Sequence, residues 1–346
     1  MKEFARRTFV VAIVVAGVVV AVLALWELRL LIALLFLAFI VAAAMRPSVE
    51  WLKRRGVPRG AGIGLHYVAL AGLVGLLLWL VVPRAIDQVR AGIGDTDLDS
   101  SEETGWKHDV LVAIDGWLND LPPARDLVDP ALELTVLGFE ILFGIFFVLA
   151  SAAYWIFERE RAVRIVMSLL PRPRREVVRD TWDLIDLKLG AYVRGQLLLV
   201  LLVATVLSVS FRAIGLPYWI LVGAFAGVVE IVPVIGPLTA GALAVGVGLT
   251  VSWQLALAAG LVVLVVRLLE DYLVIPKVLG DAVGLSPLVV LVAVTATAIL
   301  FGGFAVLLAI PIAAVLATLV SVIVLDKDPA EEDVPTVLFP AKDAEG

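Results

Sequence analysis

The sequence lacks cysteine entirely, so it can form neither a disulfide framework nor a thiolate metal site. Histidine is almost absent as well, because His66 and His108 are the two present and they stand far apart in the chain. We interpret His66, which comes near the start of an apolar run, as a side chain at a membrane interface rather than a ligand. The sequence therefore predicts no metal site.

Sequence motifs of several common enzymes are missing too. The chain has no HExxH of zinc proteases, no GxSxG of serine hydrolases and no Walker A loop for ATP. Its basic residues are not interleaved with aromatic residues in the way that nucleic-acid binding requires. We therefore expect neither an enzyme nor a nucleic-acid-binding protein, and we predict no cofactor.

Charge is scarce, since Lys, Arg, Asp and Glu make up 17% of the 346 residues while 62% are hydrophobic. The mean hydropathy of +1.04 is far above what the surface of a water-soluble domain can carry. We predict an all-α integral membrane protein, surrounded by membrane lipid, with about eight transmembrane helices. Two of its segments, 218–250 and 288–325, are expected to be interrupted or re-entrant.

Apolar and charged segments alternate along the chain. We assign 1–82 to three spans around a basic loop, 83–130 to an acidic extracytoplasmic segment with an amphipathic helix, and 131–157 to a fourth span. A basic amphipathic segment follows at 158–195, then a transport core at 196–325 and an acidic tail at 326–346 that we expect to be disordered. Apolar runs predict the crossings at 8–25, 30–45, 61–82, 131–157, 196–211, 218–250, 255–273 and 288–325.

The distribution of basic residues predicts the orientation of the chain in the membrane. Three Lys or Arg precede the first span and five lie in the loop at 46–60, whereas residues 84–133 hold four against twelve acidic residues. Residues 158–195 hold nine more. Because Lys and Arg concentrate in cytoplasmic loops, we expect both termini and both basic segments in the cytoplasm.

Two charged segments carry apolar residues at helical spacing. The first series is Trp106, Val110, Ala113, Trp117 and Leu121, and the second is Val178, Trp182, Ile185, Leu189 and Tyr192. Each predicts an amphipathic helix that lies on the membrane, packs on its own protein or pairs with another subunit. Pairing between subunits is one of these alternatives, and we expect a homo-oligomer.

The stretch from residue 216 to 250 is apolar but too long for one crossing. About 33 residues of helix extend roughly 50 Å, against ~30 Å of hydrocarbon. The stretch is interrupted by Glu230, Pro233, Gly236 and Pro237. Each proline removes a backbone donor, so carbonyls nearby lose their partners, and in a membrane such a break must be sheltered in protein or face a watery cavity. The carboxyl of Glu230 needs the same shelter, a combination typical of a transporter binding site.

A second overlong segment, 288–325, is interrupted by Gly302, Gly303 and Pro311. Its GGFA sequence and following proline are spaced much as GAFA and Pro233 are in the first segment. A pair of broken segments in corresponding places indicates a transporter's binding site. The likeness is short and one residue out of register, so both a true repeat and a chance similarity stay open.

Between the two broken segments, Arg267 precedes Glu270 by three residues and Asp271 by four. The three side chains can therefore pair on one face of a helix. We hypothesise that they line a polar pathway together with Glu230 and Lys277. The alternatives are an ion-pair lock that fixes the register of the helices, or a charged cluster at the membrane edge.

Three runs of the sequence are similar to the AI-2E family of membrane transporters. They are GLPYWILVGAFAGVVEIVPVIGP from residue 215, RLLEDYLVIPKVLGDAVGLSPLVV from 267 and FGGFAVLLAIPIAAV from 301. The most specific parts are Ile231, Val232 and Pro233 with Gly236 and Pro237, and Glu270 and Asp271 with Pro276, Lys277, Val278 and Gly280. YVRGQ at 192–196 also resembles the family, whereas Val234 departs from the aromatic residue often found there.

The resemblance implies a multi-pass protein of the inner (plasma) membrane. Members of the family are associated with export of the quorum-sensing signal autoinducer-2, a small hydroxylated furanone derivative, while similar proteins act as sodium or lithium/proton antiporters. We expect a secondary carrier or exporter of a small polar solute, with H⁺ or Na⁺ as a coupling ion and Glu230 carrying a proton. A passive channel or membrane scaffold is the alternative, because Gly223 and Gly227 also suit close helix packing.

Overall fold

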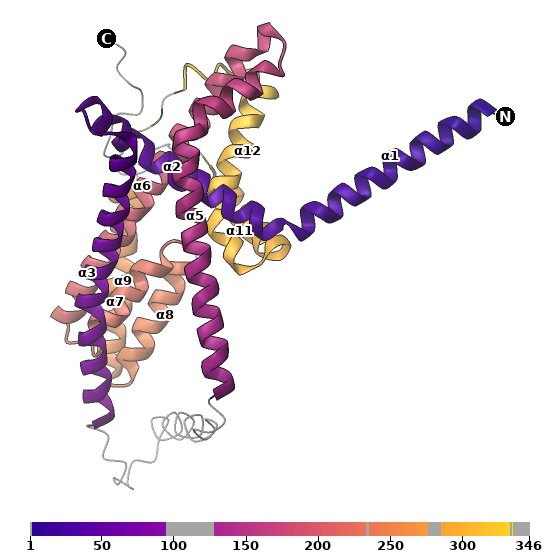
Figure 1. Ribbon diagram of the computed structural model, residues 1–346. Coiled ribbons are helices and arrows are strands. Elements are labelled where there is room, and N and C mark those ends of the chain that lie inside the picture. The colour runs from indigo at the N-terminus through magenta and orange to yellow at the C-terminus, as the bar shows by residue number, and fades with distance from the viewer. Residues whose placement is uncertain (1, 95–127, 233–234, 276–284, 333, 335–346) are drawn as a thin grey trace.

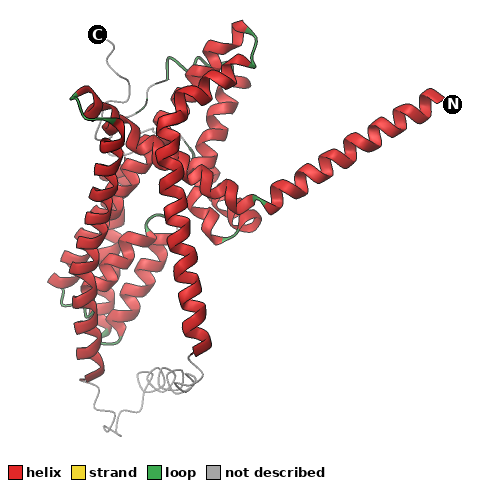
Figure 2. Ribbon diagram, viewed as in Figure 1, coloured by secondary structure: helices red, strands yellow, loops and turns green. Residues whose placement is uncertain are grey.

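The computed structural model describes residues 2–94, 128–232, 235–275, 285–332 and 334 (Figure 1). Every regular element in these ranges is a helix, as the colouring by secondary structure shows (Figure 2). Five of these helices are long and apolar enough to cross a membrane, and shorter apolar helices accompany them. The expected all-α membrane class is confirmed for the described residues.

The first half of the described chain consists of long helices. They are α1 (Lys2–Glu27), α2 (Arg29–Arg54), α3 (Arg59–Gly94) and α5 (Val128–Ser168). The second half is built from α6 (Arg175–Ala213), α7 (Trp219–Val229), α8 (Ile235–Leu249), α9 (Trp253–Leu269), the π-helix η2 (Glu270–Val274), α11 (Pro287–Phe301), the 3₁₀-helix η3 (Gly303–Leu308) and α12 (Ala309–Ile323). A further short 3₁₀-helix, η1 (Arg172–Arg174), precedes α6. The amphipathic helix expected at 106–121 lies outside the described residues.

Small side chains bring the N-terminal helices together. α2 packs against both α3 and α5, and Ala38, Ala42 and Ala152 are almost fully buried where these helices meet. Such short side chains let helix backbones approach closely, which is how helices associate without a hydrophobic driving force in lipid. α1 has no comparable packing and projects away from the other helices (Figure 1).

The helix α6 joins the two halves of the molecule, since it packs against α2, α5, α7, α9 and α12. Its contact with α7 depends on two glycines. A Cβ atom on Gly223 would lie 2.7 Å from the Cα atom of Ser208, and one on Gly227 would lie 2.7 Å from the carbonyl oxygen of Val200. These distances leave no room for a side chain, so this GxxxG pair serves close helix packing.

The interrupted segment at 218–250 forms a helical hairpin. α7 has 11 residues and α8 has 15, and the two helices pack against each other. At 1.5 Å per residue they extend only about 16 and 22 Å, less than the ~30 Å of a hydrocarbon layer. The chain therefore turns back at the break, as the re-entrant alternative predicts, and the segment is not one continuous helix. α8 then packs against α9, which carries the chain onward.

The segment at 288–325 also turns back on itself, because α11 and α12 pack against each other around η3. The turn begins at Gly302, whose φ of +86° and ψ of 176° lie in a region open almost only to glycine. The expected interruption at Pro311 is wrong. Pro311 is the third residue of α12, where the backbone nitrogen has no helical partner to lose, and its side chain is buried.

The apolar series at 178–192 packs within its own chain. Trp182 stacks on Trp155 of α5 with ring centroids 6.0 Å apart, and Phe39 of α2 meets both rings edge-on. Leu189 is almost fully buried among residues of α2, η3 and α12. Of the alternatives open from the sequence, the structure therefore has the series buried against neighbouring helices of the same molecule.

The beginning of the C-terminal tail differs from the expected disorder. Pro329 is buried, and Glu332 pairs with Lys188 of α6 at 2.6 Å. Val334 packs against Ala191 on the same helix. Residues 335–346 lie outside the described residues, so the expectation of disorder stays a prediction for that part alone.

Candidate functional site

The candidate site lies where α7 ends, next to the last turn of α9. Glu230 follows the last residue of α7, and a helix end leaves backbone carbonyls without partners. One of them is satisfied by α6, because Nε2 of Gln196 donates to the carbonyl oxygen of Glu230 at 3.1 Å. Gly223, Gly227 and Glu230 thus meet α6 at Ser208, Val200 and Gln196 in turn, so α7 runs antiparallel to α6 and ends level with Gln196.

Arg267 on α9 holds three carboxylates. Its Nη1 atom lies 3.0 Å from Oε1 of Glu230 and 3.2 Å from Oε2 of Glu270, and its Nη2 atom lies 2.9 Å from Oδ1 of Asp271. Glu230 and Glu270 are 7% and 3% exposed, whereas the side chain of Asp271 is 41% exposed. We call these four residues the charge cluster. One guanidinium faces three carboxyls here, so the cluster has negative charge to spare for a proton or a cation.

The charge cluster sits on an irregular piece of helix. Glu270 and Asp271 begin the π-helix η2, in which the backbone bonds skip from residue i to residue i+5. Such a turn is wider than an α-helical turn, and π-helical turns occur frequently at functional sites. Arg267 still reaches both carboxyls, as the spacing in the sequence predicts. Nothing in the spacing of residues along the chain indicated the π-helix itself.

Two other predicted residues shape the turn between α7 and α8. A Cβ atom on Gly236 would lie 2.1 Å from the carbonyl oxygen of Val229, so the turn closes only with glycine at this position. Pro237 is the third residue of α8, where the missing backbone donor costs no helical bond. Four further candidates, Pro233, Pro276, Lys277 and Gly280, lie outside the described residues.

Three candidates belong to the other hairpin and make no contact that holds the charge cluster. Gly302 and Gly303 form the turn before η3, and Pro311 lies in α12, which packs on α6 and α11. The structure therefore brings together Glu230, Arg267, Glu270 and Asp271, with Gly236 and Pro237 at the adjoining turn. Gln196, which the sequence analysis noted only inside a motif, joins them through its hydrogen bond.

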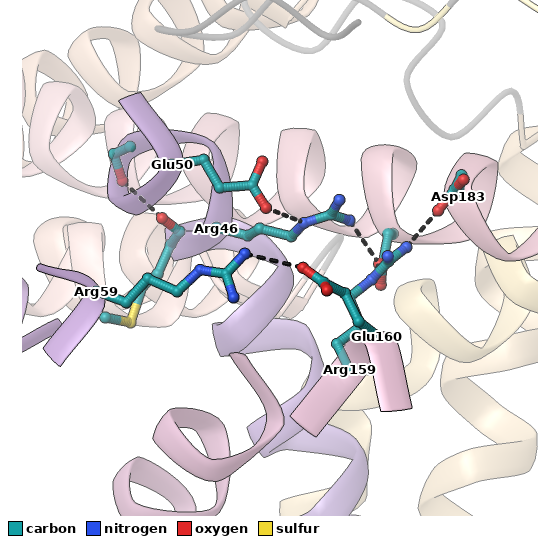
Figure 3. A network of polar contacts seen from close by, with 9 residues as sticks. Arg46, Glu50, Arg59, Arg159, Glu160 and Asp183 are labelled. Atoms are coloured by element: carbon teal, nitrogen blue, oxygen red, sulfur yellow. Dashed lines mark hydrogen bonds and ion pairs between the residues drawn. The ribbon is translucent and has the colours of Figure 1, made fainter. Parts of the chain in front are cut away.

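A second charged network joins the ends of α2, α3, α5 and α6 (Figure 3). Arg159 on α5 pairs with Asp183 and with Asp186 on α6, and Asp186 also receives Nη1 of Arg46 at 3.2 Å. Glu50 and Glu160 pair with Arg46 and Arg59 at 2.8 and 2.9 Å. Spacing along the sequence did not reveal this network, because its pairs depend on how separate helices pack. The network links α2 and α5 to α6, and it links α3 to α5.

Apolar helices of spanning length, two helix hairpins and a sheltered charge cluster define a multi-pass membrane protein of the transport class. The comparison with known families agrees, since residues 11–325 match the family described as AI-2E family transporter. The chain belongs to this family, as the resemblance of its motifs predicted.

Known relatives are similar over most of their length. Two are from Bacillus subtilis (strain 168): "Putative transport protein YrrI" and "Putative transport protein YueF" are each 26% identical, over 82% of this chain and 83% of each relative. "Putative transport protein MT0215" of Mycobacterium tuberculosis (strain CDC 1551 / Oshkosh) is 24% identical, over 86% of this chain and 84% of that protein. Their names describe transport proteins and not enzymes.

Proposed function

We propose that the protein is a secondary carrier that moves a small polar solute across the inner membrane, with the charge cluster binding the solute or its coupling ion. The observation that carries the proposal is the ion pairing of Arg267 with three carboxyls at a helix break. A lone charge at the centre of a bilayer costs at least ~2.5–3.5 kcal/mol, so charges within spanning segments are rare and mark ion and solute pathways.

The composition of the cluster favours H⁺ or Na⁺ as the coupling ion. Glu230 and Glu270 are both buried and both contact Nη1 of Arg267, which cannot fully compensate two carboxylates and Asp271 as well. A proton on one carboxyl, or a sodium ion beside it, lowers this excess of negative charge.

The proposed orientation follows the basic residues. With both termini and the loops at 46–60 and 158–195 in the cytoplasm, α7 and α8 form a hairpin that enters from outside, and the charge cluster lies near its cytoplasmic end. With neither hairpin counted as a crossing, fewer than eight full crossings remain, and the connection between α8 and α9 lies outside instead of in the cytoplasm. Both termini and the two basic loops keep their sides. Since α1 leaves large apolar side chains such as Phe9 and Val11 exposed, we also propose that it packs against lipid or a second copy in a homo-oligomer.

Two classes of substrate are compatible with the charge cluster. Export of a small hydroxylated solute such as autoinducer-2 is the first, because carboxylates accept hydrogen bonds from hydroxyls. Exchange of sodium or lithium for protons is the second, and the excess of carboxyls over guanidinium favours it. A scaffold without transport activity would need the glycine contacts between α6 and α7 but not the charge cluster.

Uptake into proteoliposomes tests the proposal. Purified protein is reconstituted, and flux of ²²Na⁺ and of hydroxylated solutes is measured with and without a proton gradient. A flux that the gradient accelerates supports a coupled carrier when Glu230→Gln slows it and removes its response to the gradient, while Glu158→Gln, at an exposed residue of α5, leaves it intact. Flux that ignores the gradient points to a channel, and no flux of any solute points to a scaffold.

A further inference from the structure

The described part of the C-terminal tail lies along the N-terminal half of α6. A pocket of about 240 Å³ lies between them, lined by Asp180, Asp183, Leu184 and Leu187 of α6 and by Pro329, Ala330 and Glu332 of the tail. Pro329 is buried beside the helix, and Val334 packs against Ala191 further along it. The tail is thus laid along α6 after it leaves α12.

The contact depends on one buried lysine. The side chain of Lys188 is 9% exposed, and its Nζ atom donates to Oε1 of Glu332 at 2.6 Å and to Oγ1 of Thr318 at 3.2 Å. A buried ammonium without a carboxylate partner is strongly unfavourable. Glu332 therefore supplies the charge that lets Lys188 stay inside. Because the side chain of Glu332 is 39% exposed, water can reach this pair and compete for it.

The docked tail contacts α6 close to the place where α6 meets α12. Lys188, which pairs with the tail, also donates to Thr318 of α12, and Val334 of the tail covers Ala191. The following turns of α6 carry Gln196, whose side chain holds the backbone of Glu230 at the charge cluster. A shift of α6 against α12 must therefore break the pair of Lys188 with Glu332 or carry the tail along.

We propose that residues 328–332 and Val334 form a releasable strap, held on α6 by the ion pair of Lys188 with Glu332, which restrains α6 and slows transport until the strap detaches from α6. The restraint rests on the proposed function, whereas the docking and release of the strap do not. Two separate measurements therefore test them.

Alkylation of single cysteines tests docking, because the natural chain has no cysteine to interfere. Val334→Cys is expected to react with a maleimide at least about fivefold more slowly than Lys327→Cys, an exposed position on the same tail. Adding Glu332→Gln is expected to remove that protection. If Glu332→Gln alone fails to fold, Lys188→Met is combined with it, which removes both charges. This double change is expected to remove the protection of Val334→Cys to the same extent. Equal rates for Val334→Cys and Lys327→Cys in the otherwise natural chain overturn the proposal.

A reversible disulfide tests the restraint. Ala191 and Val334 are in contact, so the pair Ala191→Cys and Val334→Cys is expected to cross-link on oxidation and to lower flux in proteoliposomes at least about fivefold, with recovery after reduction. Ala191→Cys alone serves as the control and is expected to keep the same flux in both conditions. Equal flux with and without the cross-link, or no cross-link at all, overturns the strap. Absence of flux from every protein, including the natural chain, counts against the proposed function, and the alkylation rates still decide whether the tail docks.

Discussion

Arg267 and Glu230 are 37 positions apart in the sequence, yet Nη1 of Arg267 donates to Oε1 of Glu230 at 3.0 Å. Arg267 lies in the last turn of α9 and Glu230 follows α7, so this bond ties the hairpin of α7 and α8 to the neighbouring helix. Neutralising one carboxyl in the charge cluster therefore changes the attraction between the hairpin and α9. Binding of a proton or a cation can in this way be coupled to movement of the hairpin.

The contact between α6 and α7 predicts a large effect for one added methyl group. Gly227→Ala is expected to lower the free energy of unfolding by about 1–3 kcal/mol, since the new Cβ atom would lie 2.5 Å from Cβ of Ala204. Gly246→Ala in α8 is the matched control, because nothing lies within 4 Å of its added Cβ atom. Thermal unfolding in detergent measures both, and equal midpoints for the two variants would contradict the close packing.

The turn between α11 and η3 predicts a conformational penalty. Gly302→Ala is expected to cost about 1–3 kcal/mol in the free energy of unfolding, because φ at this position is +86° and an L side chain rarely adopts it. There is space around the added atom, so strain in the backbone is the whole cause. Gly303→Ala, one residue later and without a positive φ, is expected to cost far less. The same thermal assay compares them, and a harmless Gly302→Ala would show that the turn is built differently.

The charged network of Figure 3 predicts a cost for removing a single partner. Arg159→Ala leaves Asp186 buried with less compensation, and breaking a buried pair in this way typically costs about 3–5 kcal/mol. Arg161→Ala, two residues on, removes an exposed pair with Glu158 at 3.6 Å and is expected to change stability by less than about 1 kcal/mol. Chemical unfolding measures the stability of the two variants. Similar free energies of unfolding would mean that Arg159 contributes no more to stability than a surface residue does.

The sequence predicted the break near Glu230 because proline removes a helical hydrogen bond and glycine disfavours a helix in any surroundings. It also predicted the pairing of Arg267 with Glu270 and Asp271, because residues three and four apart share one helix face. Both predictions depend on local geometry alone. The roles of this break and of these ion pairs in transport stay predictions.

Other features depend on packing and were beyond the sequence. Prolines show where a helix ends but not the direction in which the chain leaves, so the hairpin of α7 and α8 stayed one of two alternatives. Pro311 was misread because its effect depends on where α12 begins. The pairs of Arg159 with Asp183 and Asp186 require α5 and α6 to lie side by side, and nothing in the spacing of those residues indicates this.

The most direct test of a coupled carrier is the pH dependence of flux in Glu230→Gln. The amide keeps the size of the side chain, and its oxygen can still accept a hydrogen bond from Arg267, although a weaker one than a carboxylate accepts. It can neither lose nor gain a proton. Proteoliposomes are prepared with the natural chain, with Glu230→Gln and with the control Glu158→Gln, and solute flux is recorded as external pH is varied. The account predicts that the first and third proteins respond to pH and that Glu230→Gln transports slowly and without a pH response. An unchanged rate and pH profile in Glu230→Gln would contradict it.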